Sequence, residues 1–323
     1  DSVRGANKAL LSNSTSAEIT STDFFTSFDS NGFTLPPNAG TQTNQSGTSY
    51  VAWNWYAPTS ETNNAGSNGA TITSTIKKNV DAGFSIVSYT GNATSGATIG
   101  HGLSQELDLC IVKSTNLGQS WNVYVKDITD TSAKYLRLNQ NDGILTTTNP
   151  RFIPNNFTSD VFSVGSDNAA NGNNDNYIAY CFHSVDGYSR IGSYVGTDAP
   201  NNVIVTGFEP AFLMIKSTGS TNGEWIIFDN KRNTANPRHD VLKANSSAAE
   251  TTEAALDIDF TTNGFILNGA TAAGGRGNIN TSNVTFIFMA FAQDPDTTPA
   301  TEADSFEAKT YTGNGGTQEI DLS

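Results

Sequence analysis

The chain has 323 residues, and its 17 Lys and Arg against 31 Asp and Glu give a net charge of −14 at neutral pH. Such an acidic chain repels phosphate groups, and no apolar run reaches the roughly 18 residues that span a bilayer, so neither nucleic-acid binding nor membrane insertion is expected. Only 15% of the residues are charged while 10% are aromatic, which is too many aromatics for a disordered chain. We expect a rigid all-β protein with polar turns.

An internal repeat organises the chain. Three segments share a pattern of Phe, four residues, Phe, one residue and Leu or Val, and each leads through a Gly/Asn-rich loop into an aromatic strand. The segments are 28–35, 157–164 and 260–267, and the strands are 50–55, 177–182 and 286–291. Residues 10–35 align with 242–267 without a gap, at about eleven identical positions. Such self-similarity is the signature of a repeat architecture.

The opening of the unit also recurs, at 83–91, 187–196 and 305–313. The repeats divide the chain into the C-terminal half of one unit, a linker, two complete units, a second linker and the start of a further unit. Their bounds are 1–57, 58–82, 83–185, 186–294, 295–304 and 305–323. Because both ends fall inside repeats, we expect the polypeptide to be longer on both sides.

Each unit has six short segments rich in β-branched or aromatic residues, which predicts tandem jelly-roll-like or concanavalin-like β-sandwiches. In the strand 177–182, Ile178, Tyr180 and Phe182 point to one side, and their counterparts in the other units are all apolar. We predict that this side faces the sandwich core, whereas the opposite side is half-buried and suits subunit contacts. Asn-Gly at 31–32 and 263–264 predicts two-residue hairpins.

Histidine and cysteine are the first candidates for chemistry. A catalytic or metal-binding histidine should recur with the repeat or have local partners, and His101, His183 and His239 do neither. We therefore interpret all three as packing or surface residues. The two cysteines, Cys110 and Cys181, lack the spacing of zinc ligands and are expected to be buried thiols, with their redox state open.

Asp257 and Asp259 stand at positions i and i+2, which would place two carboxylates on one face of a strand. Glycoside hydrolases act through such pairs. The equivalent residues of the first unit, Phe25 and Ser27, carry no carboxylate. We interpret the two acids as solvated strand-edge residues, and no catalytic residue or enzymatic activity is predicted.

The loop 165–176 is crowded with oxygen donors, which hard cations prefer. Its two acids, Asp167 and Asp175, are candidate calcium ligands, and no other cofactor is expected. The loop does not match the EF-hand register, and Gly/Asn loops are also common because they tolerate left-handed backbone. The glycine-rich run 274–277 is followed by neither a GK[ST] motif nor a helix, so it predicts a loop tip and no phosphate site.

Aromatic side chains on loops can stack on sugar rings. Tyr56, Tyr188 and Tyr194 are the exposed candidates for such a ligand site. Trp121 and Trp225 recur at equivalent positions and are expected to be core anchors, because tryptophans shared by every repeat are more often packing residues.

The combined pattern resembles a family of tandem β-domains in virion and tail-fibre proteins of marine tailed bacteriophages, domains of unknown function often found beside concanavalin-like lectin domains. The segments that carry the resemblance, which covers nearly the whole chain, are 48–55, 83–91, 99–103, 187–194, 207–216 and 245–250. The family has no established catalytic residues to carry over. The resemblance implies a virion structural protein.

From these observations we expect a tail fibre or related appendage that spaces and presents a host-receptor-binding surface. Its expected partners are other virion proteins, further copies of itself in a trimer, and a cell-surface glycan or protein receptor. The expected location is the virion, outside the host cell. The alternatives are a secreted lectin-like adhesin that binds glycans and a capsid decoration protein.

Overall fold

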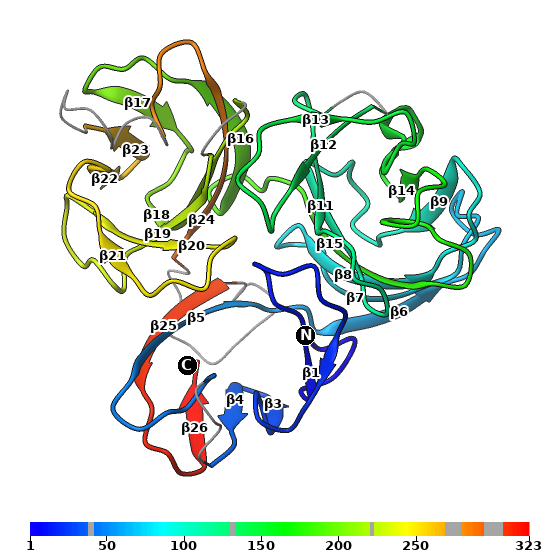
Figure 1. Ribbon diagram of the computed structural model, residues 1–323, viewed down its shortest axis with the longest axis horizontal. Helices are drawn as coiled ribbons and strands as arrows, with labels where there is room; N and C mark the ends of the chain where they lie inside the picture. Colours follow the sequence, from blue (N-terminus) through cyan, green and yellow to red (C-terminus); the bar gives the residue numbers. More distant parts are fainter. Residues whose placement is uncertain (38–41, 130–132, 220–222, 269–278, 294–305, 323) are drawn as a thin grey trace.

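The computed structural model describes residues 1–37, 42–129, 133–219, 223–268, 279–293 and 306–322, and their strands form antiparallel sheets. Within these residues the helical structure is limited to one 3-10 turn, η1 (Pro154–Asn156). The prediction of an all-β protein is therefore confirmed. Figure 1 shows three lobes arranged around a common centre, with both chain termini in the same lobe.

The first lobe combines the two ends of the chain. Its strands are β1 (Lys8–Ala9), β2 (Ile19–Thr20), β3 (Ser27–Asp29), β4 (Gly32–Leu35), β5 (Ser49–Trp55), β25 (Phe306–Thr312) and β26 (Gln318–Asp321). β5 pairs with β25, and β4 pairs with β26. The sequence alone places these two ends in different repeat units. An alignment identifies the type of a repeat segment but not its partner, and here the two partial units pair with each other.

The second and third lobes repeat one strand order. The second contains β6 (Thr59–Asn63), β7 (Ser74–Asn79), β8 (Phe84–Thr90), β9 (Ala97–Gly100), β10 (Leu109–Ser114), β11 (Asn122–Val125), β12 (Lys134–Arg137), β13 (Leu145–Thr146), η1, β14 (Val161–Val164) and β15 (Asn176–Phe182). The third contains β16 (Ser189–Val195), β17 (Asn202–Val205), β18 (Pro210–Ser217), β19 (Trp225–Asp229), β20 (Asp240–Lys243), β21 (Thr251–Thr252), β22 (Ile258–Thr261), β23 (Gly264–Leu267) and β24 (Thr285–Ala292). The run β13-β12-β11-β10-β15-β8 corresponds to β21-β20-β19-β18-β24-β16. The described residues of the second and third lobes form ten and nine strands, more than the predicted six, because several strands are short and because β6 and β7 precede the predicted unit.

The segment 58–82 is not the linker that its composition predicts. It forms β6 and β7, which pair with each other and extend the main sheet of the second lobe beyond β8. Thr, Ser and Lys dominate these strands because polar residues suit the edge of a sheet, and the same residues resemble a linker. Ile76 anchors β7 with no exposed surface. The second predicted linker, 295–304, lies outside the described residues.

The long aromatic strand of each complete lobe is buried on both faces, which corrects the prediction of one core face and one contact face. Ile178 and Phe182 of β15 belong to a central cluster shared by all three lobes, whereas Tyr177 and Cys181 belong to the interior of their own lobe. A strand between two cores is apolar on both sides, so alternation does not reveal which side faces its own lobe. The face predicted to be the sandwich core lies between the lobes.

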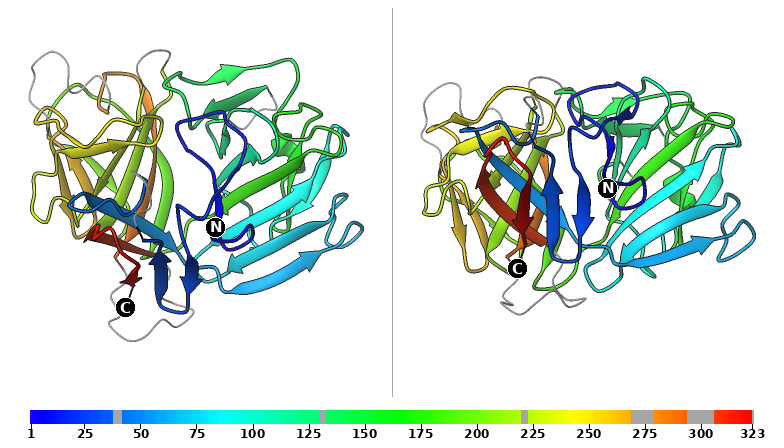
Figure 2. Two further views of the ribbon diagram at one scale, coloured as in Figure 1. Left: turned by 60° about the horizontal axis from the view of Figure 1, so that its bottom comes forward. Right: turned by 90° about the horizontal axis from the view of Figure 1, so that it is seen from below.

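Three equivalent aromatic residues meet at the centre. Trp55 and Phe182 end β5 and β15, and Phe291 is the last residue but one of β24. Their ring centroids lie 6.3 Å apart for Trp55–Phe182, 5.5 Å for Trp55–Phe291 and 6.1 Å for Phe182–Phe291. The lobes therefore close around one shared core and do not follow one another in a row. Figure 2 shows the same grouping in two further views.

Two-residue hairpins are present at both predicted places, but their loops are Ser30-Asn31 and Thr262-Asn263 and not the predicted Asn-Gly pairs. Asp29 pairs with Gly32 and Thr261 with Gly264, so each loop has two residues and the glycine begins the next strand. A Cβ at Gly264 would lie 2.0 Å from the carbonyl oxygen of Ile204 on the neighbouring strand. Close strand approach therefore requires this glycine.

Candidate functional site

The three histidines do not form a site. His101 is fully buried, His183 is 4% exposed, and His239 is only half-buried. The His101 Nδ1 accepts a hydrogen bond from the Leu103 amide at 3.3 Å, which leaves Nε2 to donate to the Thr158 carbonyl at 3.4 Å. Burial lowers the pKa of His101 to about 4, against an opposing effect of the Thr158 carbonyl. His101 is a neutral core residue.

Acid is expected to destabilise the second lobe through His101. Between pH 4 and 6.5 the unfolded chain binds a proton that the folded imidazole refuses, so stability rises with pH across this window and is lost as the pH falls. The loss on going from pH 7 to pH 4.5 should be roughly 2 to 3 kcal/mol. Urea unfolding of the wild type and of His101→Gln at both pH values tests this. An equally large pH effect in the variant would contradict it.

The candidate calcium ligands already have partners. The Oδ2 of Asp167 accepts from Arg151 Nη1 at 2.8 Å, and its Oδ1 accepts from the Ala169 amide at 2.8 Å. Asp175 accepts from the side-chain amide of Asn116 at 3.0 Å. Among the described residues no group of three or more His, Cys, Asp or Glu side chains is placed to hold a metal ion. The structure therefore gives these two acids structural roles.

The same loop contains a buried asparagine that the sequence analysis did not single out. The Asn171 Oδ1 accepts from the Asn92 amide at 2.9 Å, and its Nδ2 donates to the carbonyls of Thr94 and Gly165 at 2.9 and 2.8 Å. The Tyr89 hydroxyl donates to the carbonyl of Ala170, the preceding residue, at 2.7 Å. The oxygen-rich loop is thus held by its own hydrogen bonds.

This tyrosine–asparagine latch recurs in every lobe. Tyr194 donates to the residue before Asn280, and Tyr311 donates to the residue before Asn44. The latch asparagines, Asn44, Asn171 and Asn280, each lie six residues before an aromatic strand and are at most 2% exposed. That constant spacing is the sequence signal that could have identified them.

The remaining candidates from the sequence, which are two acids, two cysteines and two tryptophans, do not come together in one site. Asp259 accepts from Asn268 at 2.7 Å, and burial together with the charge of Asp259 raises the pKa of Asp257. Cys110 and Cys181 are buried, as predicted, on paired strands with their Sγ atoms 4.0 Å apart. Trp121 and Trp225 are 6% and 2% exposed, which confirms them as core anchors. Residues 274–277 lie outside the described part of the chain.

The three tyrosines proposed for sugar stacking are not grouped on one surface. Tyr56 is 39% exposed, as expected. Tyr188 is half-buried against Phe291, with ring centroids 5.6 Å apart, and Tyr194 is buried as a latch residue. The prediction that Tyr188 and Tyr194 are exposed is wrong, because both lie on or beside β16, whose inward side chains enter a core.

An open slot between β16 and β17 is the strongest candidate for a binding site. Val195, Val203 and Val205 are 55%, 60% and 60% exposed, which is unusual for valines at strand positions. Beside them a hollow of about 250 Å³ is lined by Arg190, Gly192, Ser193, Tyr194, Val203, Ile204, Val205 and Phe288. β16 is an edge strand of its sheet within the described chain. An exposed edge with apolar flanks is a template for strand addition.

The second lobe shows what fills such a slot. Its equivalent strands are β8 and β9, and the segment 71–79 lies between them. β7 pairs with β8, while the amides of Thr71 and Ile72 donate to the Thr98 carbonyl of β9 at 2.9 and 3.0 Å. Ile72 and Ile76 are 6% and 0% exposed. The chain's own extended segment therefore occupies in the second lobe the position that is open in the third.

The comparisons identify a family without an assigned function. A family model described as a domain of unknown function, DUF7483, matches residues 1–295. The search of curated proteins and the search of solved structures gave no significant match. Within the described residues, no helix has the length and apolar character needed to cross a membrane.

Proposed function

The chain belongs to the DUF7483 family, and on the geometry above we propose that it is a structural and docking module of a virion appendage, in which each lobe is a jelly-roll-like sandwich. The observation that carries this proposal is the open β16–β17 slot. A partner strand with apolar residues at alternate positions would bond to the edge of β16 and cover the three exposed valines. The proposed partner is another protein of the same particle.

Support comes from the rest of the molecule. The acids, histidines and cysteines that could carry chemistry are dispersed or engaged in structural hydrogen bonds. Three lobes packed around one apolar core make a compact, rigid unit, which suits a protein that holds a binding surface at a fixed place. The net charge of −14 favours solubility outside a cell.

A peptide with the sequence of residues 70–79 should bind the intact protein, because that segment fills the equivalent slot of the second lobe. Fluorescence anisotropy of the labelled peptide measures the binding. Val203→Lys should weaken it at least about tenfold by placing a charge against the apolar strand. Val80→Lys, at a valine that is 41% exposed outside the slot, is the control and should bind as the wild type does. Equal binding by both variants would reject the slot.

The location is tested separately by immunogold labelling of purified particles from the host culture. Label on a tail fibre or appendage supports the proposal. Label spread over the capsid would favour a decoration protein, and protein found only in the particle-free medium would favour a secreted adhesin. Either of the last two results overturns the appendage assignment.

A further inference from the structure

Two strand edges in the first lobe lack, within the described residues, a neighbour that both of their equivalents have. β5 pairs only with β25, whereas its equivalents β15 and β24 each lie between two strands. β1 pairs only with β2, whereas its equivalents β12 and β20 each pair on both sides. The described part of the first lobe therefore has no pair that corresponds to β10–β11 in the second lobe and β18–β19 in the third.

Burial differs accordingly. Six of the seven residues of β5 are half-exposed, whereas β15 and β24 are almost wholly buried. The interior of the first lobe has a small buried cluster of Phe33, Leu35 and Ile320, with Phe25 only partly covered beside it. Phe25 also lines a hollow of about 570 Å³. In the other lobes, residues of the β10–β11 and β18–β19 pairs fill this interior.

Three lobes around a centre form three interfaces, and two kinds of hydrogen bond between lobes occur at two of these interfaces. The indole of Trp121 donates to the Leu11 carbonyl at 3.0 Å, and that of Trp225 donates to the Arg137 carbonyl at 2.8 Å. In the same cyclic order, the Glu18 amide donates to the Thr115 carbonyl at 2.8 Å, and the Ile144 amide to the Thr218 carbonyl at 3.1 Å. On one side of each contact, the residue lies in or directly beside the β10–β11 or the β18–β19 pair. Trp121 precedes β11 and Trp225 begins β19, while Thr115 and Thr218 follow β10 and β18.

The third lobe has residues equivalent to those that make these two contacts in the first and second lobes. Lys243 is the equivalent of Leu11 and Arg137, and Glu250 is the equivalent of Glu18 and Ile144. In the described part of the chain, no indole donates to the Lys243 carbonyl and no carbonyl accepts from the Glu250 amide. The neighbouring Ala244 carbonyl accepts from the Ser12 hydroxyl of the first lobe at 2.7 Å, so this part of the third lobe lies against the first.

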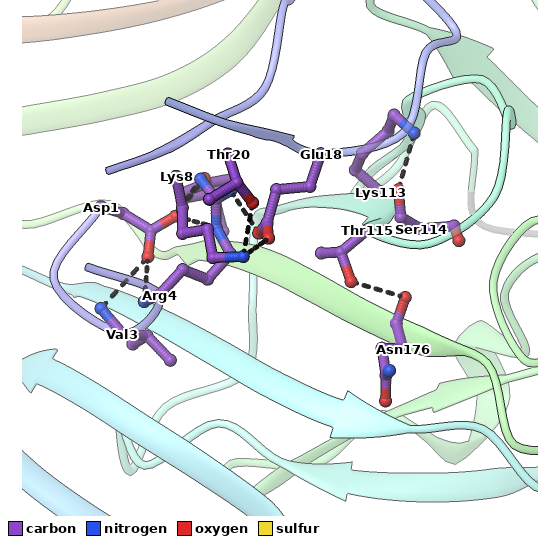
Figure 3. Close-up of polar contacts among 11 residues, drawn as sticks. Asp1, Val3, Arg4, Lys8, Glu18, Thr20, Lys113, Ser114, Thr115 and Asn176 are labelled. Atoms are coloured by element: carbon purple, nitrogen blue, oxygen red, sulfur yellow. Dashed lines mark hydrogen bonds and ion pairs between the residues drawn. The ribbon is translucent and has the colours of Figure 1, made fainter. Parts of the chain in front are cut away.

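A repeated ion-pair arrangement gives the register of the strand that is absent here. Asp1 accepts from the amide and Nε of Arg4, and the Arg4 guanidinium bonds to Glu18 at 3.0 Å (Figure 3). In the third lobe, Asp229 accepts in the same way from Arg232, whose guanidinium bonds to Glu250 at 2.8 Å. Asp229 is the last residue of β19. Asp1 therefore lies where the second strand of the pair ends.

We propose that the edges of β5 and β1 bind a β-hairpin of the same repeat type, whose second strand ends beside Asp1. Its first strand would pair with β5 as β10 pairs with β15, and its second strand with β1 as β11 pairs with β12. Its tryptophan would donate to the Lys243 carbonyl, and its loop carbonyl would accept from the Glu250 amide. The hairpin would add to the interface between the first and third lobes the two contacts that the other two interfaces have.

The test joins a copy of residues 106–124, the β10–β11 hairpin, to Asp1 of the full chain. In the predicted register, Leu109 of the copy lies opposite Trp55, and Ser114 lies opposite Tyr50. Hydrogen exchange of the β5 amides that do not face β25, and of the Glu250 amide, should slow at least about tenfold, and the Tm should rise. The β24 amides, already paired on both sides, are the internal reference and should not change.

A control copy carries Val112→Pro, which removes a strand amide and prevents pairing while the composition stays nearly the same. This variant should leave β5 and Glu250 exchange as in the unextended chain. The proposal is overturned if the intact copy gives no protection while β24 shows the normal fold, or if the proline copy protects β5 equally. Neither outcome affects the β16–β17 slot, which lies in another lobe.

Discussion

Asn171→Ala is expected to lower the free energy of unfolding by about 2 kcal/mol. The substitution removes an acceptor from the Asn92 amide and a donor from the carbonyls of Thr94 and Gly165. Gly165 is buried, whereas Asn92 and Thr94 are exposed, so the Gly165 carbonyl carries most of the cost. Each buried polar group left without a partner costs about 1–3 kcal/mol. Urea unfolding followed by tryptophan fluorescence measures the change.

Asn173→Ala is the matched control, because Asn173 lies in the same loop but is exposed. Its effect should stay within about 0.5 kcal/mol, as for most surface substitutions. Equal effects of the two variants would show that the latch hydrogen bonds do not account for the loss of stability.

Addition of calcium should leave the wild-type unfolding midpoint unchanged, because Asp167 keeps its ion pair with Arg151. A clear rise in the midpoint would instead support a calcium site at this loop.

The latch shows why the sequence predicted a metal loop and missed a structural one. Oxygen donors can coordinate a cation or bond to backbone amides, and composition alone does not separate the two. The repeated glycines give a sharper signal. A Cβ at Gly91 or Gly196 would lie 2.3 or 2.1 Å from a carbonyl of the loop after the latch asparagine. Tyr89 and Tyr194 precede these glycines by two residues, so the whole motif is readable once its geometry is known.

The fold was predictable to the level of strands and repeats. Hydrophobic pattern and turn residues identified the aromatic strands, the two-residue hairpins and the recurring Trp121 and Trp225. The ring arrangement was not predictable, because a strand such as β15 with apolar residues on both faces is compatible with several partners. The polar strands β6 and β7 were missed because strands at the edge of a sheet and linkers share a composition, and β6 is the edge that β7 joins to the sheet.

For the candidate site, too, the strands were predictable from the sequence but their exposure was not. Val203 and Val205 read as ordinary strand residues, and only their 60% exposure marks them. Their exposure depends on whether another segment covers the strand. In the second lobe the segment 71–79 covers β9, the equivalent of β17, and in the third lobe the two valines of β17 stay exposed. A binding surface formed by the absence of a covering strand has no local sequence motif.

Phe291→Ala is expected to cost about 4 to 5 kcal/mol, because Phe291 connects the cores of all three lobes. It is 1% exposed, and its ring lies 5.5 Å from Trp55 of the first lobe and 6.1 Å from Phe182 of the second. Truncation of a buried Phe leaves a cavity and removes aromatic contacts, which together cost about 3–5 kcal/mol in a rigid core. The measurement is equilibrium unfolding in urea.

The effect should also reach beyond the third lobe, which separates a shared core from three independent ones. Hydrogen exchange of β5 and β15 should speed up in Phe291→Ala although the substitution lies in β24, because Trp55 and Phe182 lose a common neighbour. Phe28→Ala, at a phenylalanine that is 42% exposed, is the control and should cost less than about 1 kcal/mol. If faster exchange in Phe291→Ala stayed within the third lobe, the lobes would be energetically separate and the closed-ring account would fail.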